Sequence, residues 1–200
     1  CYPIHLPDNW KQIQLIDATH AEKANKRALV ALQNNVSGIC FSNPNNLEQL
    51  LAGISIEHIS VDFKDYATTF PEEWKKYISG KSVRGAFHGI EYIDIPNFKN
   101  TISAKGKTAK NQIEFALKNG SDSKGDIQFH FEIGADFFIE IAKLKAFRIL
   151  WKNETGKDAF IFTESSKNNK ETEFEYNNLL RTTTECMSAI FGGANAVLVN

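Results

Sequence analysis

Short β-branched and aromatic runs alternate with amphipathic stretches along almost the whole of this 200-residue chain. Most of the runs are short and apolar throughout, which is typical of strands buried on both faces of a parallel sheet. Parallel strands need long crossover connections, so the alternation predicts an α/β fold with helices between the strands. We expect strands at residues 38–42, 59–63, 83–88, 92–98, 127–133, 159–164 and 195–199.

The number of expected strands favours a (β/α)8 barrel of the TIM type that is truncated to about seven βα units. A doubly wound open sheet is the alternative, but no glycine-rich dinucleotide-binding turn follows the early strands. The chain begins with Cys1 and stops inside the apolar run 196–200. We therefore expect residues 1–200 to form a single, partial barrel domain of a longer protein.

Composition excludes several classes of function. Hydrophobic residues make up 42% of the chain, charged residues 24%, and the net charge is −1, so a nucleic-acid interface or a basic membrane patch is not expected. The sequence holds no apolar run that could span a bilayer. Three widely spaced cysteines without a CxxC pattern argue against disulfides, and scattered histidines argue against a metal site. We expect a reducing, cytoplasmic setting.

Residue chemistry alone predicts no catalytic machinery, because no nucleophile stands at a recognisable spacing from a base. Thr163 and Ser165 lie at the end of an expected strand, on the face that carries barrel active sites. Their hydroxyls could bind a substrate oxygen or their own backbone. Arg181 and Glu185 are four residues apart and are interpreted most simply as a helix ion pair or as part of a solvated helix face. His130, between two phenylalanines, is interpreted as an interior histidine.

Two long motifs distinguish the second half of the chain. Residues 134–151 read GADFFIEIAKLKAFRILW, and residues 178–193 read NLLRTTTECMSAIFGG. Both resemble the barrel domain of the methylmalonyl-CoA mutase family, and more closely that of its small, non-cobalamin-binding subunit. The first follows the family pattern G-x-x-F-x-x-E-I-A-K-x-R-A-x-R-x-L-W, with Lys145 in place of an arginine. The second follows N-x-x-R-T-T-x-E-x-M-x-A-x-x-G-G. Two long motifs in the right order are a specific signal.

The resemblance implies a barrel that holds adenosylcobalamin against a separate flavodoxin-like domain and interconverts methylmalonyl-CoA and succinyl-CoA in propionate metabolism. The cobalamin-binding pattern D-x-H-x-x-G is absent from these 200 residues. We therefore expect no cobalamin domain in this chain, with the cofactor bound mainly by a large catalytic subunit in a heterodimer. Glu185 matches the family glutamate that faces the cofactor's ribose, a role that would be vestigial in a subunit without cobalamin.

The family's catalytic strand ends in G-Y-H-M-Q-E-A-G, and its histidine contacts the substrate carbonyl. The corresponding residues 95–101 contain no histidine, and Asn97 most nearly takes its place. An amide cannot supply the same proton-donating group. Asn97, Asn100 (which matches a small-subunit asparagine), Thr163 and Ser165 are the candidates for an acyl-CoA pocket.

These departures predict a non-catalytic small subunit with no catalytic residue of its own. The first alternative is an active acyl-CoA mutase barrel whose cobalamin domain is encoded elsewhere. The second is an unrelated barrel enzyme such as an aldolase or hydrolase, which would need a lysine or paired carboxylates at several strand ends. Only Glu164 is clearly so placed, with Asp62 and Glu91 near other strand ends.

Overall fold

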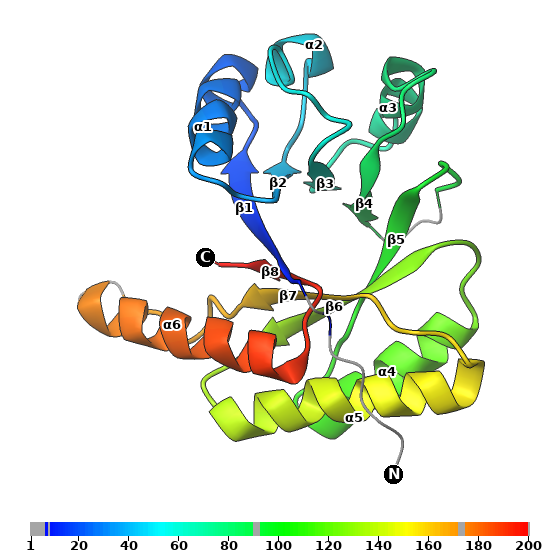
Figure 1. Ribbon diagram of the computed structural model, residues 1–200, viewed down its shortest axis with the longest axis vertical. Helices are drawn as coiled ribbons and strands as arrows, with labels where there is room; N and C mark the ends of the chain where they lie inside the picture. Colours follow the sequence, from blue (N-terminus) through cyan, green and yellow to red (C-terminus); the bar gives the residue numbers. More distant parts are fainter. Residues whose placement is uncertain (1–6, 8, 90–92, 172–174, 200) are drawn as a thin grey trace. The chain divides into compact units, whose positions relative to one another are not determined.

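A computed structural model describes residues 7, 9–89, 93–171 and 175–199. The strand order follows the chain from β1 to β8 and is closed, so the predicted class, an α/β barrel of the TIM type, is confirmed (Figure 1). The strands are β1 (Lys11–Asp17), β2 (Gly38–Ser42), β3 (Ser60–Lys64), β4 (Arg84–His88), β5 (Phe98–Ser103), β6 (Ile127–Ile133), β7 (Ile161–Ser165) and β8 (Ala196–Leu198). The helices are α1 (Ala21–Gln33), α2 (Leu47–Leu50), α3 (Phe70–Tyr77), α4 (Ala109–Ser121), α5 (Phe137–Thr155) and α6 (Glu175–Gly192).

Eight strands, and not the seven predicted, are present in the described residues. The strand missing from the prediction is β1, whose sequence KQIQLID mixes polar and apolar residues and has a matching mixed burial pattern. The prediction of a strand over 92–98 was wrong in place. Residue 92 lies outside the described residues, residues 93–97 form no strand, and β5 begins only at Phe98. The sequence of β5, FKNTIS, has too few apolar residues to signal a buried strand.

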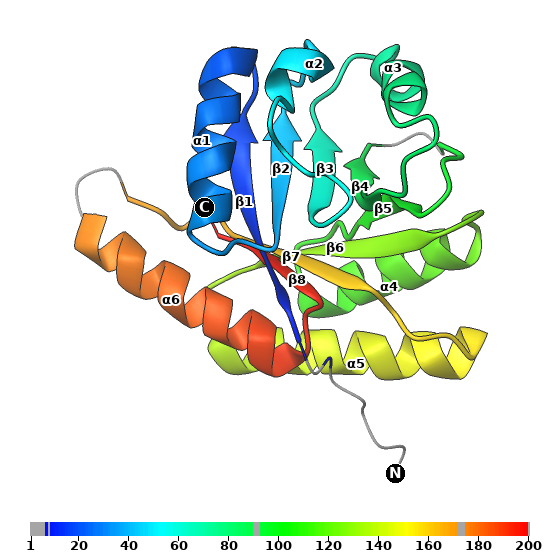
Figure 2. The ribbon, with the colours of Figure 1, turned by 45° about the horizontal axis from the view of Figure 1, so that its top comes forward.

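The chain divides into two compact units. The amino-terminal unit comprises Gln12–Thr101 and Lys124–Asp126. Its strands β2, β3 and β4 pair in parallel and bring Phe41, Phe63 and Phe87 into register. Trp74 of α3 packs edge-on against Phe63, with ring centroids 4.8 Å apart. These rings are buried. Figure 2 shows the helices α1 to α3 along one side of the strands β2, β3 and β4.

The carboxyl-terminal unit contains Ile102–Ser123 and Ile127–Asn200, together with Cys1–Lys11. Its helices α5 and α6 lie side by side, and α4 also packs against α5. Its core is aromatic, with Phe129 of β6 packing edge-on against Phe147 and Trp151 of α5 at 4.6 and 4.7 Å. None of the helices in the described ranges is long and apolar enough to cross a bilayer.

Alternation along β6 and β7 sorts the side chains of this unit into two faces. Phe129, Phe131 and Ile133 belong to the core under the helices. The residues that alternate with them, Gln128, His130 and Glu132, therefore project from the opposite face of the strand, which we call the His130 face. The parallel register pairs Glu132 with Glu164 of β7, so this polar face continues across both strands.

Candidate functional site

His130, in the middle of β6, lies at the centre of a polar cluster whose other members come from β5 and β7. Its Nε2 atom is 3.4 Å from Oε2 of Glu164 on β7. Its Nδ1 atom is 3.3 Å from Oγ of Ser103, the last residue of β5. The ring of Phe162 meets the imidazole edge-on, with centroids 5.6 Å apart. The cluster therefore places an imidazole between a hydroxyl and a carboxylate.

Glu132 anchors the loop that follows β7. The hydroxyl of Ser166 donates a hydrogen bond to the Glu132 carboxylate. The backbone N–H of Ser166 donates to the carbonyl of Ile133 at 2.9 Å, and the N–H of Asn168 donates to the Ser166 hydroxyl at 3.2 Å. Lys167 of the same loop also contacts the neighbouring strand β7, because its Nζ atom lies 3.8 Å from Oε1 of Glu164. The loop after β7 is thereby folded back over the end of β6.

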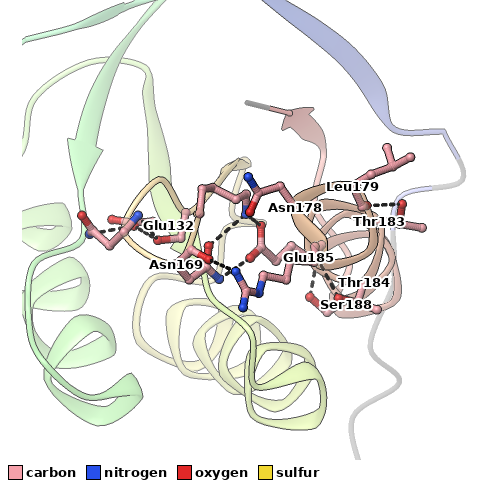
Figure 3. A network of polar contacts seen from close by, with 12 residues as sticks. Glu132, Asn169, Asn178, Leu179, Thr183, Thr184, Glu185 and Ser188 are labelled. Atoms are coloured by element: carbon pink, nitrogen blue, oxygen red, sulfur yellow. Dashed lines mark hydrogen bonds and ion pairs between the residues drawn. The ribbon is translucent and has the colours of Figure 1, made fainter. Parts of the chain in front are cut away.

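Glu185 of α6 is sequestered within the same unit. Its side chain has no exposed area, and Lys170 Nζ lies 2.7 Å from its Oε2 atom. Its Oε1 atom accepts a hydrogen bond from the amide of Asn169 at 2.5 Å. Figure 3 shows Glu185 pointing from α6 toward the loop that carries Asn169. Both carboxylate oxygens thus have partners in the loop that follows β7.

Arg181 does not pair with Glu185, so the predicted helix ion pair is wrong. Its guanidinium donates to the carbonyl of Asn169 at 2.8 Å and pairs with Glu171 at 2.7 Å. Asn178 bonds the backbone of Glu171 through both ends of its amide. These side chains of the second motif therefore hold the loop after β7 against α6.

The threonines of the second motif bond to their own helix. Thr183 donates to the carbonyl of Leu179 at 2.7 Å, and Thr184 donates to that of Arg181 at 2.8 Å. Both residues are exposed. Ser188 is buried and donates to the carbonyl of Glu185 at 2.8 Å. Figure 3 shows these three hydroxyls along α6. Threonine has a poor helix propensity. In α6 the hydroxyls of Thr183 and Thr184 are satisfied by carbonyl groups of their own helix.

A cofactor ribose does not fit Glu185 in this arrangement. A ribose hydroxyl would need a carboxylate oxygen with a free approach, whereas this side chain is buried and both its oxygens are engaged. Lys170 in addition neutralises the charge that would strengthen such a hydrogen bond. The contacts of Glu185 with Asn169 and Lys170 therefore hold the loop after β7 against α6.

Thr163 and Ser165 occur on the helix-covered side of β7. Both are buried, and they alternate with Phe162 and Glu164, which belong to the His130 face. The hydroxyl of Thr163 donates to the carbonyl of Ala196 on β8 at 3.1 Å. This contact ties two strands together, and a role for either residue in a substrate pocket remains a prediction.

Asn97 and Asn100 belong to the amino-terminal unit, whereas Thr163 and Ser165 belong to the carboxyl-terminal unit. Asn97 is exposed and occupies the left-handed region, with φ of 62°, in the turn before β5. Asn100 is half-buried, and its amide accepts from the N–H and donates to the carbonyl of Ile93 at 2.8 and 3.0 Å. Its two polar atoms therefore shape the segment that leads into β5.

Ser103, Glu132, Asn169 and Lys170 were not among the predicted site residues. The period-two pattern of β6 could have indicated Glu132, since it shares a face with His130. Ser103 could not be found because β5 was misplaced. A second imidazole–carboxylate pair occurs in the amino-terminal unit, where His88 Nε2 lies 3.1 Å from Asp62 Oδ2. No group of three potential metal ligands comes together within the part of the chain that the structure describes.

The charged residues of the first motif stabilise the fold. Arg148 donates to the carbonyls of Ala159 and Gly193 at 2.8 and 2.6 Å and to Oδ1 of Asn195 at 3.0 Å. It thereby joins α5 to the segments that lead into β7 and β8. Burial lowers the pKa of Arg148, with the charge of Asp158 opposing that shift.

Lys143 connects the end of β6 to α4. Its Nζ atom donates to the Glu132 carbonyl and to Gln112 Oε1, each at 2.9 Å. The carboxylate of Glu140, one turn earlier on the same helix, is 2.5 Å from Nζ. Burial lowers the pKa of the Lys143 ammonium, although the charge of Glu140 opposes that shift.

Comparison with known proteins identifies relatives of the second half of the chain. The profile of the methylmalonyl-CoA mutase family matches residues 107–200. The methylmalonyl-CoA mutase of Rhizobium meliloti is 32% identical over an alignment 143 residues long, which covers 56% of this chain and 20% of that protein. The methylmalonyl-CoA mutase small subunit of Porphyromonas gingivalis is 42% identical over an alignment 85 residues long, which covers 36% of this chain and 13% of that protein. The matches thus span only a small part of each relative's own length.

A solved structure supports the fold class. The Plasmodium falciparum HPPK-DHPS, crystallised with SDX-DHP, is similar with a TM-score of 0.54 at 10% identity, covering 98% of this chain and 44% of that chain. At that identity the similarity concerns the fold alone. Both sequence motifs, by contrast, lie within the residues that the mutase profile matches. Residues 107–200 of this chain are thus similar to the methylmalonyl-CoA mutase family.

Proposed function

We propose that this protein is the small subunit of an adenosylcobalamin-dependent methylmalonyl-CoA mutase and a non-catalytic partner of the large subunit in a heterodimer. The large subunit would hold the cofactor and interconvert methylmalonyl-CoA and succinyl-CoA, in the cytoplasmic metabolism of propionate. The family match over residues 107–200 supports the enzyme class. Similarity to a protein named as a small subunit supports the existence of a partner.

The state of Glu185 carries the proposal of a non-catalytic role. In a barrel that loads the cofactor, this carboxylate would have to reach a ribose hydroxyl. Here Lys170 and Asn169 occupy both of its oxygens, and the side chain has no exposed area. Exposing it would break an ion pair at 2.7 Å and leave a charge without its partner. The family glutamate is thus used to fix the loop after β7.

The charges of the His130 face also favour this role. Glu132 and Glu164 are Cα partners on neighbouring strands and share one face. The acyl group of methylmalonyl-CoA carries a carboxylate of the same sign as these two glutamates. Like charges at this separation disfavour binding of such a ligand. Lys167, which is 60% exposed, compensates only one of the two carboxylates.

The signature side chains that remain have structural uses. Lys143, Arg148 and Arg181 each bond backbone carbonyls of their own unit. Preservation of both motifs is therefore consistent with a barrel retained for stability and for contact with a partner. The alternative is an active mutase barrel with its cobalamin domain elsewhere. It is favoured by the contacts of His130 with Ser103 and Glu164, which give this unit an acid–base group.

Co-purification tests the proposal. The full-length protein is tagged, expressed with its untagged large subunit and assayed for mutase activity with adenosylcobalamin. We expect a one-to-one complex whose kcat changes less than about twofold in Glu185→Gln and Asn97→Ala, since about twofold corresponds to only a few tenths of a kcal/mol. Replacing the matching glutamate of the large subunit is the positive control. A hundredfold loss in either variant, with the complex intact, would instead establish this barrel as catalytic.

A further inference from the structure

We propose that Ser103, His130 and Glu164 form a hydrolytic site for acyl thioesters, with Ser103 as nucleophile and His130 as general base. The thioester class rests on the proposed function, whereas the site itself rests on the geometry of the carboxyl-terminal unit. Ser103 Oγ lies 3.3 Å from His130 Nδ1, and His130 Nε2 lies 3.4 Å from Glu164 Oε2. A nucleophile, a base within reach of it and a group that orients the base are the parts that acyl transfer needs.

The backbone fixes this geometry. Ser103, His130 and Glu164 come from β5, β6 and β7, and all lie in the carboxyl-terminal unit. Directly after Ser103, the N–H of Ala104 donates to the carbonyl of His130 at 2.8 Å. This bond sets the serine beside the imidazole. In barrels of this class the carboxyl ends of the strands are where reactive groups collect.

The carboxylate selects the tautomer that the chemistry needs. The Glu164 carboxylate lies 3.4 Å from Nε2 without a hydrogen bond to it, and its negative charge favours the proton of a neutral imidazole on that nitrogen. Nδ1 is then left to accept the hydroxyl proton of Ser103. Phe162, edge-on to the ring, restricts its rotation. Glu164 therefore acts as a positioning residue, and it does not itself touch the substrate.

The proposed nucleophile is more exposed to solvent than the base and the carboxylate behind it, as catalysis requires. Ser103 is exposed, whereas the side chains of His130 and Glu164 are only 19% and 13% exposed. A substrate can thus approach the hydroxyl while the base and its partner stay in place. The separations of 3.3 and 3.4 Å are slightly long, as is usual before a substrate is bound.

The reaction follows from these roles. Ser103 Oγ bonds to the acyl carbon as its proton passes to His130 Nδ1, and the carbon–sulfur bond breaks as that proton is passed to the departing sulfur. A water molecule then gives its proton to His130 and its oxygen to the acyl carbon. The carboxylic acid leaves, and the proton returns to Ser103 Oγ. The sum is a thioester plus water, giving an acid and a thiol, with no redox step.

Covalent labelling tests the nucleophile. The full-length protein, without large subunit or cobalamin, is treated with a fluorophosphonate probe and mapped by mass spectrometry. We expect one adduct, on Ser103, which Ser103→Ala abolishes and the matched change Ser123→Ala, at an exposed serine of the same unit, leaves unchanged. An adduct elsewhere, or none on a protein whose melting temperature is normal, would overturn the proposal.

Release of CoA thiol from propionyl-CoA tests the activity. We expect at least about a hundredfold loss of kcat in Ser103→Ala and His130→Gln, as for removal of a nucleophile or general base. Glu164→Gln should lower kcat about tenfold or more with KM unchanged, which a merely structural role would not do. Hydrolysis that persists in Ser103→Ala refutes the site. Because neither assay includes the large subunit, their failure leaves the proposed partnership untouched, and failure of co-purification leaves the labelling result standing.

Discussion

Lys170 and Glu185 form an ion pair 2.7 Å long in which the glutamate is fully buried and the lysine is only 17% exposed. Removing one partner of such a pair leaves an uncompensated charge. We expect Lys170→Met to lower the free energy of unfolding by about 3–5 kcal/mol, measured by urea denaturation. The double change Lys170→Met/Glu185→Gln should recover most of that loss. Lys26→Met removes an exposed pair with Glu22 and should have no measurable effect. Equal effects of the two lysine changes would contradict this interpretation.

Arg148 supplies donors to three acceptors from two different segments. Because these acceptors and the guanidinium are largely buried, Arg148→Met should cost about 3–5 kcal/mol of unfolding free energy. Arg148→Lys should be intermediate, since an ammonium on a shorter reach cannot span all three positions. Lys145→Met, on the same helix but outside these contacts, is the control. Chemical denaturation monitored by tryptophan fluorescence gives the comparison, and a fully stable Arg148→Lys would show that charge alone suffices.

Lys143 predicts a pH dependence of stability. Burial holds the folded-state pKa of Lys143 below its ordinary value of 10.5, which the unfolded chain retains. Between these two values the unfolded state keeps a proton that the folded state has released, so the unfolding free energy rises with pH. The penalty is complete below the folded pKa and is relieved as the pH approaches 10.5. Stability of the wild type relative to Lys143→Met should therefore increase across this alkaline window. A flat difference would show that the ammonium is not desolvated.

Gly120 lies at the end of α4, where a Cβ atom would meet Trp151 at 2.7 Å and Phe129 at 2.8 Å. Alanine would gain about 1 kcal/mol in helix propensity. Overpacking costs about 1–3 kcal/mol, and these buried rings have little room to move. We expect Gly120→Ala to be net destabilising, with a lower melting temperature, while Asn119→Ala at the exposed neighbouring position is tolerated. A rise in melting temperature for Gly120→Ala would mean that the aromatic cluster adapts.

Burial raises the pKa of the Cys186 thiol on α6 above its ordinary value of 9.0. Less thiolate is then present at mildly alkaline pH, and the thiolate is the species that reacts. Alkylation by iodoacetamide at about pH 8 should therefore be slower at Cys186 than at a cysteine in an unfolded peptide. Denaturant should remove the difference. Equal rates in the folded and unfolded protein would contradict the burial of this sulfur.

The sequence predicted the class of fold because β2 (GICFS) carries a short apolar run, β6 (IQFHFEI) alternates apolar and polar residues, and clear helices separate the strands. It failed at β1 and β5, where polar side chains such as Gln12, Gln14 and Lys99 interrupt the pattern. Those strands are specified by pairing with their neighbours, which a local pattern does not contain.

The candidate site was predictable only in part, for a related reason. Glu185 was found through the second motif, but its partner Lys170 lies 15 residues away in a loop with no regular period. Ser103 meets His130 across 27 residues. Arg181 was assigned to the wrong carboxylate because spacing on a helix identifies possible neighbours and cannot show that a loop supplies a better one.

The division of the chain into two units, each with its own core, has a historical consequence. The family profile begins at residue 107, just inside the unit that starts at Ile102. Similarity to the family is therefore concentrated in the carboxyl-terminal unit, where Arg148 and Lys143 make their contacts with residues of that same unit. A half-barrel that satisfies its own buried charges can keep its sequence while the other half diverges, so this fold can change its chemistry one half at a time.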